Sequence, residues 1–166
     1  MISPNWTIGV SMDPTTVVGI LHVTPVEADC SHLRSILRHP NWQLRRIRCC
    51  RDARALIHSR PIAIVLCEAI LPDGDWKHML EETRSAPGAP RLIVSSRLAD
   101  ERLWAEVLNL GGWDVLATPF EAGEVVRVLF SAYFSRVQTS ALRQPPNVAD
   151  SLAFGGRGLV AAAGGR

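Results

Sequence analysis

Short apolar runs alternate with segments of helical periodicity along most of the chain, from residue 17 to about residue 136. The expected strands are residues 17–23, 43–49, 62–67, 91–95 and 113–117. The expected helices are residues 26–38, 52–59, 76–84, 100–110 and 121–136. Because parallel strands need helical crossovers, five such pairs predict an α/β fold with a doubly wound five-stranded parallel sheet.

Both ends of the chain fall outside this alternation. We expect residues 1–16 to be an irregular lead-in and residues 17–137 to form the folded domain. Residues 138–166 are expected to be a disordered tail, because two prolines precede a stretch made mostly of Gly, Ala and Arg. No apolar run is long enough to span a bilayer, and no secretory signal is evident at the N-terminus. These patterns predict a cytoplasmic protein with no membrane partner.

The composition is that of a soluble globular domain, since 47% of the 166 residues are hydrophobic and 20% are charged. It excludes a wholly disordered chain, a collagen-like repeat and a coiled coil. The net charge of +2 hides an uneven distribution, because residues 31–60 hold eight arginines and a single acid, Asp52. Such a segment could meet nucleic acid or an acidic partner, but a solvated face is the simpler interpretation. We therefore do not expect a nucleic-acid partner.

The cysteines and histidines show no spacing that is typical of a metal site. Cys30, Cys49, Cys50 and Cys67 match no zinc pattern, and a disulfide between the adjacent Cys49 and Cys50 would be strained. We expect reduced thiols, some of them acting as small core residues. The five histidines form no pair suited to metal binding or to a catalytic triad. The sequence therefore predicts no metal ion and no cofactor.

In a doubly wound sheet, functional groups lie where the parallel strands end. The loops at those ends offer Thr24, Glu68, Ser95 and Thr118, without a histidine or lysine to act as a base. No Gly-rich phosphate loop follows the first strand. These observations weigh against an enzyme, although a small flavodoxin-like enzyme with an unrecognised site stays open as an alternative.

Four segments, taken in order, resemble the receiver domains of response regulators. The segment PIAIVLCEAILPDGDW (61–76) is similar to that family's third strand and the loop after it, where an acid is followed by a proline and a Gly/Asp turn. The other three are VVGILHVTPVE (17–27), LIVSS (92–96) and LNLGGWDVLATPF (108–120), which resemble the first, fourth and fifth strands. The resemblance implies a flavodoxin-like, or CheY-like, (βα)5 fold over residues 17–136.

The resemblance places Glu68 at the position of the phosphoaccepting aspartate, four residues before the loop proline Pro72. Thr24 and Pro25 stand where the family has the acidic pair that holds Mg²⁺, and Thr118 stands in place of its lysine. Phosphoryl transfer to a carboxylate needs a hard cation held by oxygen ligands, and these residues do not supply the missing charges. The resemblance therefore implies a degenerate receiver, or pseudo-receiver, that is not an enzyme.

The switch positions of the family are changed as well. Ser95 is an acceptable hydroxyl residue after the fourth strand, whereas Val115 replaces an aromatic residue and Thr118 the lysine. Glu68 has two interpretations: a built-in phosphoryl mimic that bonds Ser95 or Thr118, or an acid tolerated at the rim after the chemistry was lost. The family pattern also implies a cis peptide bond before Pro119.

Family members usually signal through the face formed by the fourth helix, the fifth strand and the fifth helix. The expected core stripe of the fifth helix is Val126, Leu129, Phe130 and Tyr133. The apolar residues outside this stripe, taken as a candidate interaction face, are Val125, Val128 and Phe134. A second copy in a homodimer, a partner or the chain's own tail could cover this face, or the helix could be deeply buried in the monomer.

The leading hypothesis is a stand-alone receiver-like module of bacterial two-component, phosphorelay-type signalling. It would work without phosphorylation, by binding a signalling protein partner through this face. The alternatives are the small flavodoxin-like enzyme and a nucleic-acid-binding protein that uses the arginine-rich segment 34–60.

Overall fold

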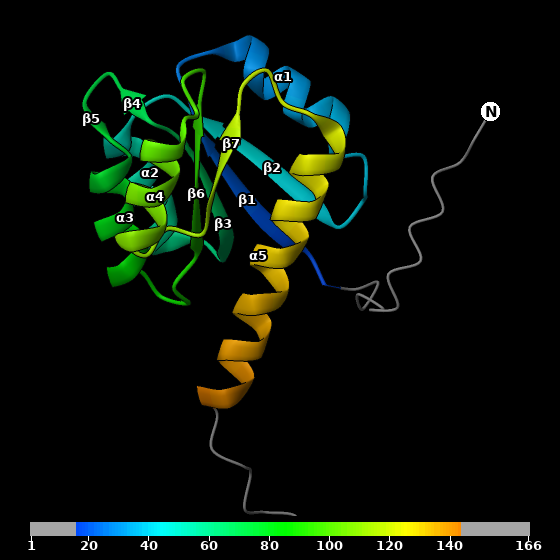
Figure 1. The fold of residues 1–166 in the computed structure, drawn as a ribbon. Coiled ribbons are helices and arrows are strands. Elements are labelled where there is room, and N and C mark those ends of the chain that lie inside the picture. Colours follow the sequence, from blue (N-terminus) through cyan, green and yellow to red (C-terminus); the bar gives the residue numbers. More distant parts are fainter. Residues whose placement is uncertain (1–15, 144–166) are drawn as a thin grey trace, which may run out of the picture.

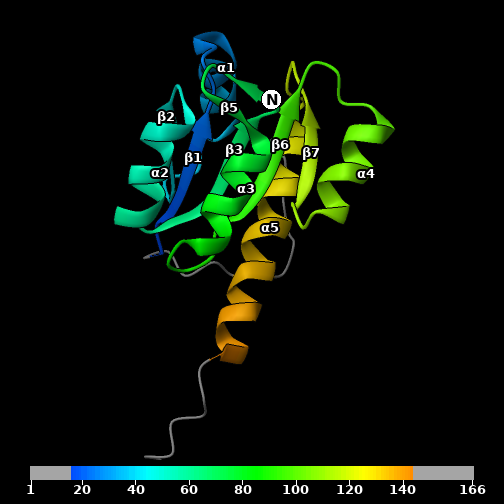
Figure 2. The ribbon, with the colours of Figure 1, turned by 90° about the vertical axis from the view of Figure 1, so that its left-hand side faces the viewer.

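Five parallel strands form the central sheet of the molecule, and helices cover both of its sides (Figures 1 and 2). The computed structural model describes residues 16–143. The sheet strands are β1 (Val18–Val23), β2 (Trp42–Ile47), β3 (Ile62–Glu68), β6 (Arg91–Ser96) and β7 (Asp114–Ala117). The helices are α1 (Glu27–Ile36), α2 (Cys50–Ser59), α3 (Trp76–Ser85), α4 (Glu101–Asn109) and α5 (Ala122–Arg143).

The strand order is β2-β1-β3-β6-β7, with every neighbouring pair parallel. This is the flavodoxin-like order of doubly wound sheets, so the predicted fold class is confirmed. Helices α1 and α5 pack on one side of the sheet, and α2, α3 and α4 on the other. None of the helices within residues 16–143 is long and apolar enough to cross a membrane.

Strand β3 lies at the centre of the sheet because its side chains can be buried on both faces. All residues from Ile62 to Cys67 are buried. Val65 and Cys67 join the core beneath α2, α3 and α4, whereas Ile64 and Leu66 join the core beneath α1 and α5. A continuous apolar run is what a parallel strand covered on both faces requires.

The loop after β3 contains a short hairpin that the sequence pattern did not predict. Strands β4 (Ile70–Leu71) and β5 (Gly74–Asp75) pair antiparallel around the Pro72–Asp73 turn. Asp73 also caps the N-terminus of α2. Its carboxylate accepts hydrogen bonds from the backbone N–H groups of Cys50 and Arg51 at 2.8 and 3.0 Å. Those donors are at the first turn of α2, where intrahelical partners are lacking.

Helix α5 corrects two expectations. It continues to Arg143, past the predicted end at residue 136, and Figure 1 shows its C-terminal part extending beyond the strands. Residues 138–143, which were assigned to the tail, are therefore helical, and the rest of that tail, like residues 1–15 of the lead-in, lies outside the described residues.

The buried face of α5 is also different from the predicted one. Its fully buried residues are Val125, Val128, Leu129 and Ala132. Val125 and Val128 are thus core residues and cannot belong to an interaction face. The predicted stripe began one residue later, at Val126, and a shift of one residue turns the helix by about 100°. Phe134 is partly exposed and stacks on Phe130, with ring centroids 6.0 Å apart.

Candidate functional site

The ends of the parallel strands bring the predicted site residues to one edge of the sheet. Glu68, at the end of β3, is paired in register with Ser95 of β6. Thr24 directly follows β1, and Thr118 directly follows β7, where its N–H donates to the carbonyl of Ser96 at 3.0 Å. The structure therefore places Thr24, Glu68, Ser95 and Thr118 along the same carboxyl edge. Pro25 follows Thr24 in the same loop.

The carboxylate of Glu68 is held on both sides. Its Oε2 accepts a hydrogen bond from the Thr24 hydroxyl at 2.9 Å, and its Oε1 lies 3.6 Å from Nη1 of Arg97. The Thr24 hydroxyl oxygen in turn accepts the backbone N–H of Val26 at 3.0 Å. The side chain of Glu68 is only 18% exposed, so these partners offset the cost of placing a carboxylate in a largely closed position.

Arg97 is the site residue that sequence reasoning missed. It follows β6, and its Nη2 also lies 3.3 Å from a carboxylate oxygen of Asp29 in α1. Arg97 thereby bridges Glu68 and Asp29, which come from different elements. The only sequence signal was a cation two residues after the switch hydroxyl position. Since no rule of spacing says where a long arginine side chain reaches, that signal was too weak to use.

The contacts of Glu68 differ from those that the mimic interpretation expected. Among the described residues, its carboxylate accepts a hydrogen bond from Thr24 and forms an ion pair with Arg97, rather than contacting Ser95 or Thr118. Ser95 and Thr118 are both buried, and the hydroxyl of Thr118 has no hydrogen-bond partner within the part of the chain that the structure describes. The Thr118–Pro119 peptide bond is cis, as the resemblance implied.

The residues at this edge do not fit Mg²⁺ held in the manner that the family implies. The acidic pair is replaced by a hydroxyl and a proline, and the Thr24 hydroxyl is already engaged with Glu68. The remaining carboxylate lies against the Arg97 guanidinium, which opposes a divalent cation beside it. We therefore derive no phosphoryl-transfer step through this site.

Thiol chemistry finds no support among the described cysteines either. All four cysteines are free. Burial raises the pKa of Cys30 and of Cys67, and burial together with the Asp73 carboxylate raises the pKa of Cys50 to about 11. These three side chains are protonated thiols near neutral pH, the form that is a poor nucleophile.

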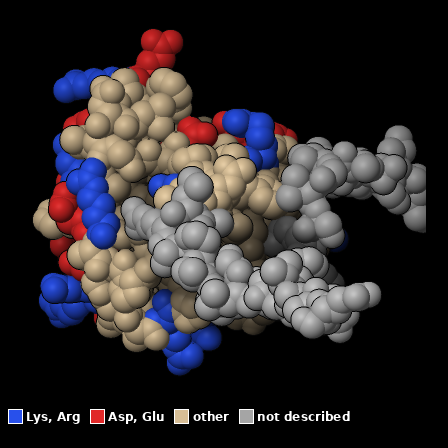
Figure 3. All heavy atoms as spheres, turned by 90° about the horizontal axis from the view of Figure 1, so that it is seen from below, with Lys and Arg blue, Asp and Glu red and all other residues tan. Residues whose placement is uncertain are grey.

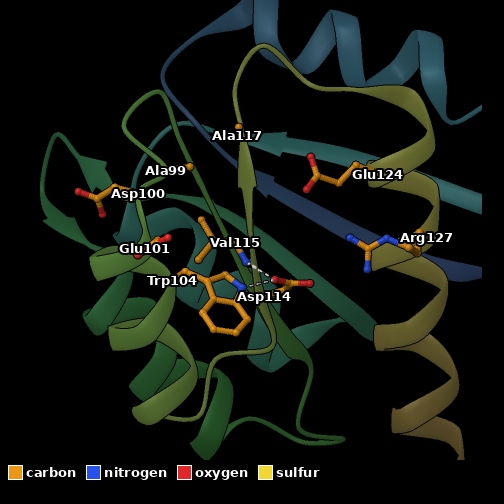
Figure 4. Close-up of a pocket in the computed structure, with 9 residues that line it drawn as sticks. All are labelled: Ala99, Asp100, Glu101, Trp104, Asp114, Val115, Ala117, Glu124 and Arg127. Carbon is orange, nitrogen blue, oxygen red and sulfur yellow. Dashed lines mark hydrogen bonds between the residues drawn. The ribbon is translucent and has the colours of Figure 1, made fainter.

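A second candidate site is a groove between α4, β7 and the start of α5 (Figure 4). Its volume is about 410 Å³. Its lining residues are Ala99, Asp100, Glu101, Trp104, Asp114, Val115, Ala117, Glu124 and Arg127. The Trp104 ring is half exposed, and its Nε1–H donates to the carboxylate of Asp114 at 3.1 Å. Of the predicted site residues, Val115 alone lines this groove.

We call the surface around this groove the α4–β7–α5 face. It corresponds to the face of the fourth helix, fifth strand and fifth helix that the resemblance implied, although Val125 and Val128, which were expected on it, are buried. Glu124 and Arg127 project from α5 toward the groove, opposite Trp104 of α4 (Figure 4). The α5 side of the groove is thus polar, whereas Val125 and Val128 are buried in the core. Sequence patterns favoured the apolar residues because hydrophobicity alone does not tell a core stripe from a docking surface.

The arginine-rich segment is partly neutralised by neighbouring acids. Nη1 of Arg46 lies 2.9 Å from a carboxylate oxygen of Glu27, and Nε of Arg54 lies 3.4 Å from one of Glu82. Arg51 and Arg54 line a shallow hollow of about 330 Å³ on α2. Viewed from below, basic and acidic side chains lie beside one another along the rim of the molecule (Figure 3). This arrangement does not favour the nucleic-acid alternative.

Comparisons with known proteins give matches among solved structures only, because no family model and no curated protein matches the chain. The signal receiver domain of an HD domain-containing protein from Pseudomonas fluorescens is 23% identical, with a TM-score of 0.69 over 82% of this chain and 100% of that one. A CheY-like receiver domain protein from Methanospirillum hungatei is 16% identical, with a TM-score of 0.65 over 75% and 99% of the two chains.

A third match has a metal in its site. The receiver domain of a sensor histidine kinase from Pseudomonas aeruginosa, described with a magnesium ion coordinated in its active-site cleft, is 20% identical. Its TM-score is 0.60 over 71% of this chain and 98% of that one. The strand order and these matches agree. The chain therefore has the CheY-like fold of response-regulator receiver domains.

Proposed function

We propose that this chain is a receiver-like signalling module that works in the bacterial cytoplasm without phosphorylation. It binds a protein partner through the α4–β7–α5 face and catalyses no reaction. One observation carries the proposal. At the position of the family's phosphoaccepting aspartate, the Glu68 carboxylate accepts a hydrogen bond from Thr24 and forms an ion pair with Arg97. The groups that would bind the metal and neutralise an acyl phosphate are a threonine, a proline and a buried threonine.

A domain that keeps a receiver fold without its chemistry still has its binding surfaces. On the α4–β7–α5 face, the half-exposed Trp104 lies beside a groove with both apolar and charged lining. Aromatic residues in such places often dominate the free energy of protein–protein association, because they bury a large area at a small entropic cost. This supports a role in recognition.

The proposal predicts that the protein is not phosphorylated by acetyl phosphate in the presence of Mg²⁺. Intact mass spectrometry measures the result, with a receiver that has the aspartate, the acidic pair and the lysine as the positive control. We expect no phosphoryl adduct, because the charges that would screen the incoming phosphate are missing. A stoichiometric adduct would overturn the proposal, and peptide mapping would then tell whether Glu68, Asp73 or Asp75 had accepted the group.

The pair between Glu68 and Arg97 is expected to add little to the free energy of unfolding. Arg97 is 57% exposed, so solvent screens the attraction between the two charges. In a double-mutant cycle of Glu68→Gln and Arg97→Ala, measured by urea unfolding, we expect a coupling energy below about 1 kcal/mol. A coupling above about 2 kcal/mol would instead make the pair a structural lock on the loop after β6.

A further inference from the structure

The lining of the groove on the α4–β7–α5 face is both apolar and acidic. Ala99, Val115, Ala117 and the Trp104 ring form its apolar part. The acidic residues of its lining are Asp100, Glu101, Asp114 and Glu124, and the basic residue of its lining is Arg127. An occupant that complements this surface presents apolar side chains next to a positive charge.

The chain itself contains a segment of this chemistry beyond α5. Residues 152–160 have the sequence LAFGGRGLV, in which Arg157 stands between Phe154 and the Leu159–Val160 pair. An arginine suits the groove better than a lysine, because its planar guanidinium can stack on an indole ring and bond a carboxylate at the same time. The surrounding glycines let the backbone approach the groove closely.

The length of chain beyond α5 is sufficient for this segment to reach the groove. The segment follows Arg143, the last residue of α5, and Arg127 lines the groove on the same helix. The distance back along α5 from Arg143 to Arg127 is about 24 Å at the rise of an α-helix. Residues 144–157 can span about 46 Å when extended. Because the segment is linked to the domain, its effective concentration at the groove is of millimolar order, so even weak binding fills the site.

We propose that residues 152–160 dock in this groove, with Arg157 between the Trp104 ring and the carboxylates of the lining. The docked segment covers the surface that a partner would use, so it acts as a built-in competitor that partner binding displaces. This regulatory role rests on the proposed function, whereas the docking itself is tested without any partner.

The experiment compares ¹H–¹⁵N spectra of the full chain and of a chain ending at Arg143. The indole signal of Trp104 is identified with a Trp104→Phe variant of each. We expect loss of residues 144–166 to shift this signal and the amide signals of Glu101, Asp114 and Glu124. Arg157→Glu in the full chain is expected to reproduce the shifts, while the matched charge reversal Arg166→Glu leaves them unchanged.

A peptide of residues 150–162 added to the shortened chain is expected to restore the signals of the full chain, with a Kd of roughly 0.1–1 mM that weakens with salt. Groove signals that are identical in the two chains would overturn the proposal. Shifts in the full chain that depend on protein concentration would also overturn it, because they would make a second copy the occupant. The spectra are recorded without a phosphodonor, so they test the docking alone. A phosphoryl adduct in the mass-spectrometry experiment would overturn the proposed function but not the docking, so the two failures are distinguishable.

Discussion

Replacing Val128 by aspartate is expected to lower the free energy of unfolding by about 4 kcal/mol or more, which is a large share of the total for a domain of this size. Val128 is fully buried in α5, among the apolar residues that pack on the sheet. A carboxylate there loses its hydration and gains no cation in return. If Val128 faced a partner or solvent, which was one of the two interpretations that the sequence left open, the same change would alter binding and leave stability almost unaffected.

The matched control is Val137→Asp, which introduces the same side chain in the same helix. Val137 is 43% exposed, so we expect the free energy of unfolding of this variant to lie within about 0.5 kcal/mol of the parent's. Urea unfolding followed by circular dichroism measures all variants. Should Val128→Asp fail to fold, Val128→Thr keeps the side-chain shape and adds one hydroxyl, with an expected loss of about 1–3 kcal/mol. Equal stability for the Val128 and Val137 variants would contradict the burial of α5 described here.

The strands and the carboxyl-edge residues were predictable because they follow from local patterns. A continuous apolar, β-branched run such as Ile62–Cys67 is buried on both faces only in the middle of a parallel sheet. Once the strands are parallel, chain direction alone brings Thr24, Glu68, Ser95 and Thr118 to the same edge. No side-chain geometry is needed for that inference, which is why it is confirmed.

The contacts made at that edge were not predictable in the same way. Arg97 reaches Glu68 and Asp29 through a long side chain whose rotamer depends on the surrounding structure. The orientation of α5 was missed for a related reason. Its apolar residues are so numerous that two stripes, one residue apart, fit a helical period equally well, and only packing against the sheet selects Val125 and Val128.

The resemblance indicated the face formed by these three consecutive elements, but the side chains that line its groove could not be predicted. Trp104 and Asp114 meet through a hydrogen bond between α4 and β7, and Glu124 joins them from α5. Each of these residues alone looks like an ordinary surface position. A charged side chain on a helix is usually just solvated, so sequence reasoning gave no ground for combining them.

The pH dependence of stability is expected to be dominated between pH 6.5 and 4 by one residue, His22 of β1. Burial, assisted by the positive charge of Arg46, lowers the pKa of His22 from 6.5 to about 4. His22 is 1% exposed and lies against Phe120 with ring centroids 5.8 Å apart, and its Nδ1 has no hydrogen-bond partner among the described residues. Within residues 16–143, no group bonded to this ring nitrogen stabilises an imidazolium.

The sign follows from the two states. In the unfolded chain His22 takes up its proton near pH 6.5, whereas in the folded protein it stays neutral until about pH 4. Between these values the unfolded state binds more protons, so the free energy of unfolding falls as the pH is lowered. The loss from this residue amounts to about 3 kcal/mol at pH 4 and levels off within about one pH unit below it.

Urea unfolding at several pH values between 7 and 4 measures this effect in the parent and in His22→Leu. The variant lacks the titrating ring. Between pH 7 and pH 4 its free energy of unfolding is therefore expected to fall by about 3 kcal/mol less than that of the parent. Acidic residues whose pKa is lowered, such as Asp73 and Glu121, contribute equally to both proteins and cancel in the difference. His32→Leu is the matched control, because His32 also lies near Phe120 but is exposed. A His22→Leu protein with the same pH dependence as the parent would show that His22 is protonated in the fold, and that the cavity around it admits water or a counter-charge.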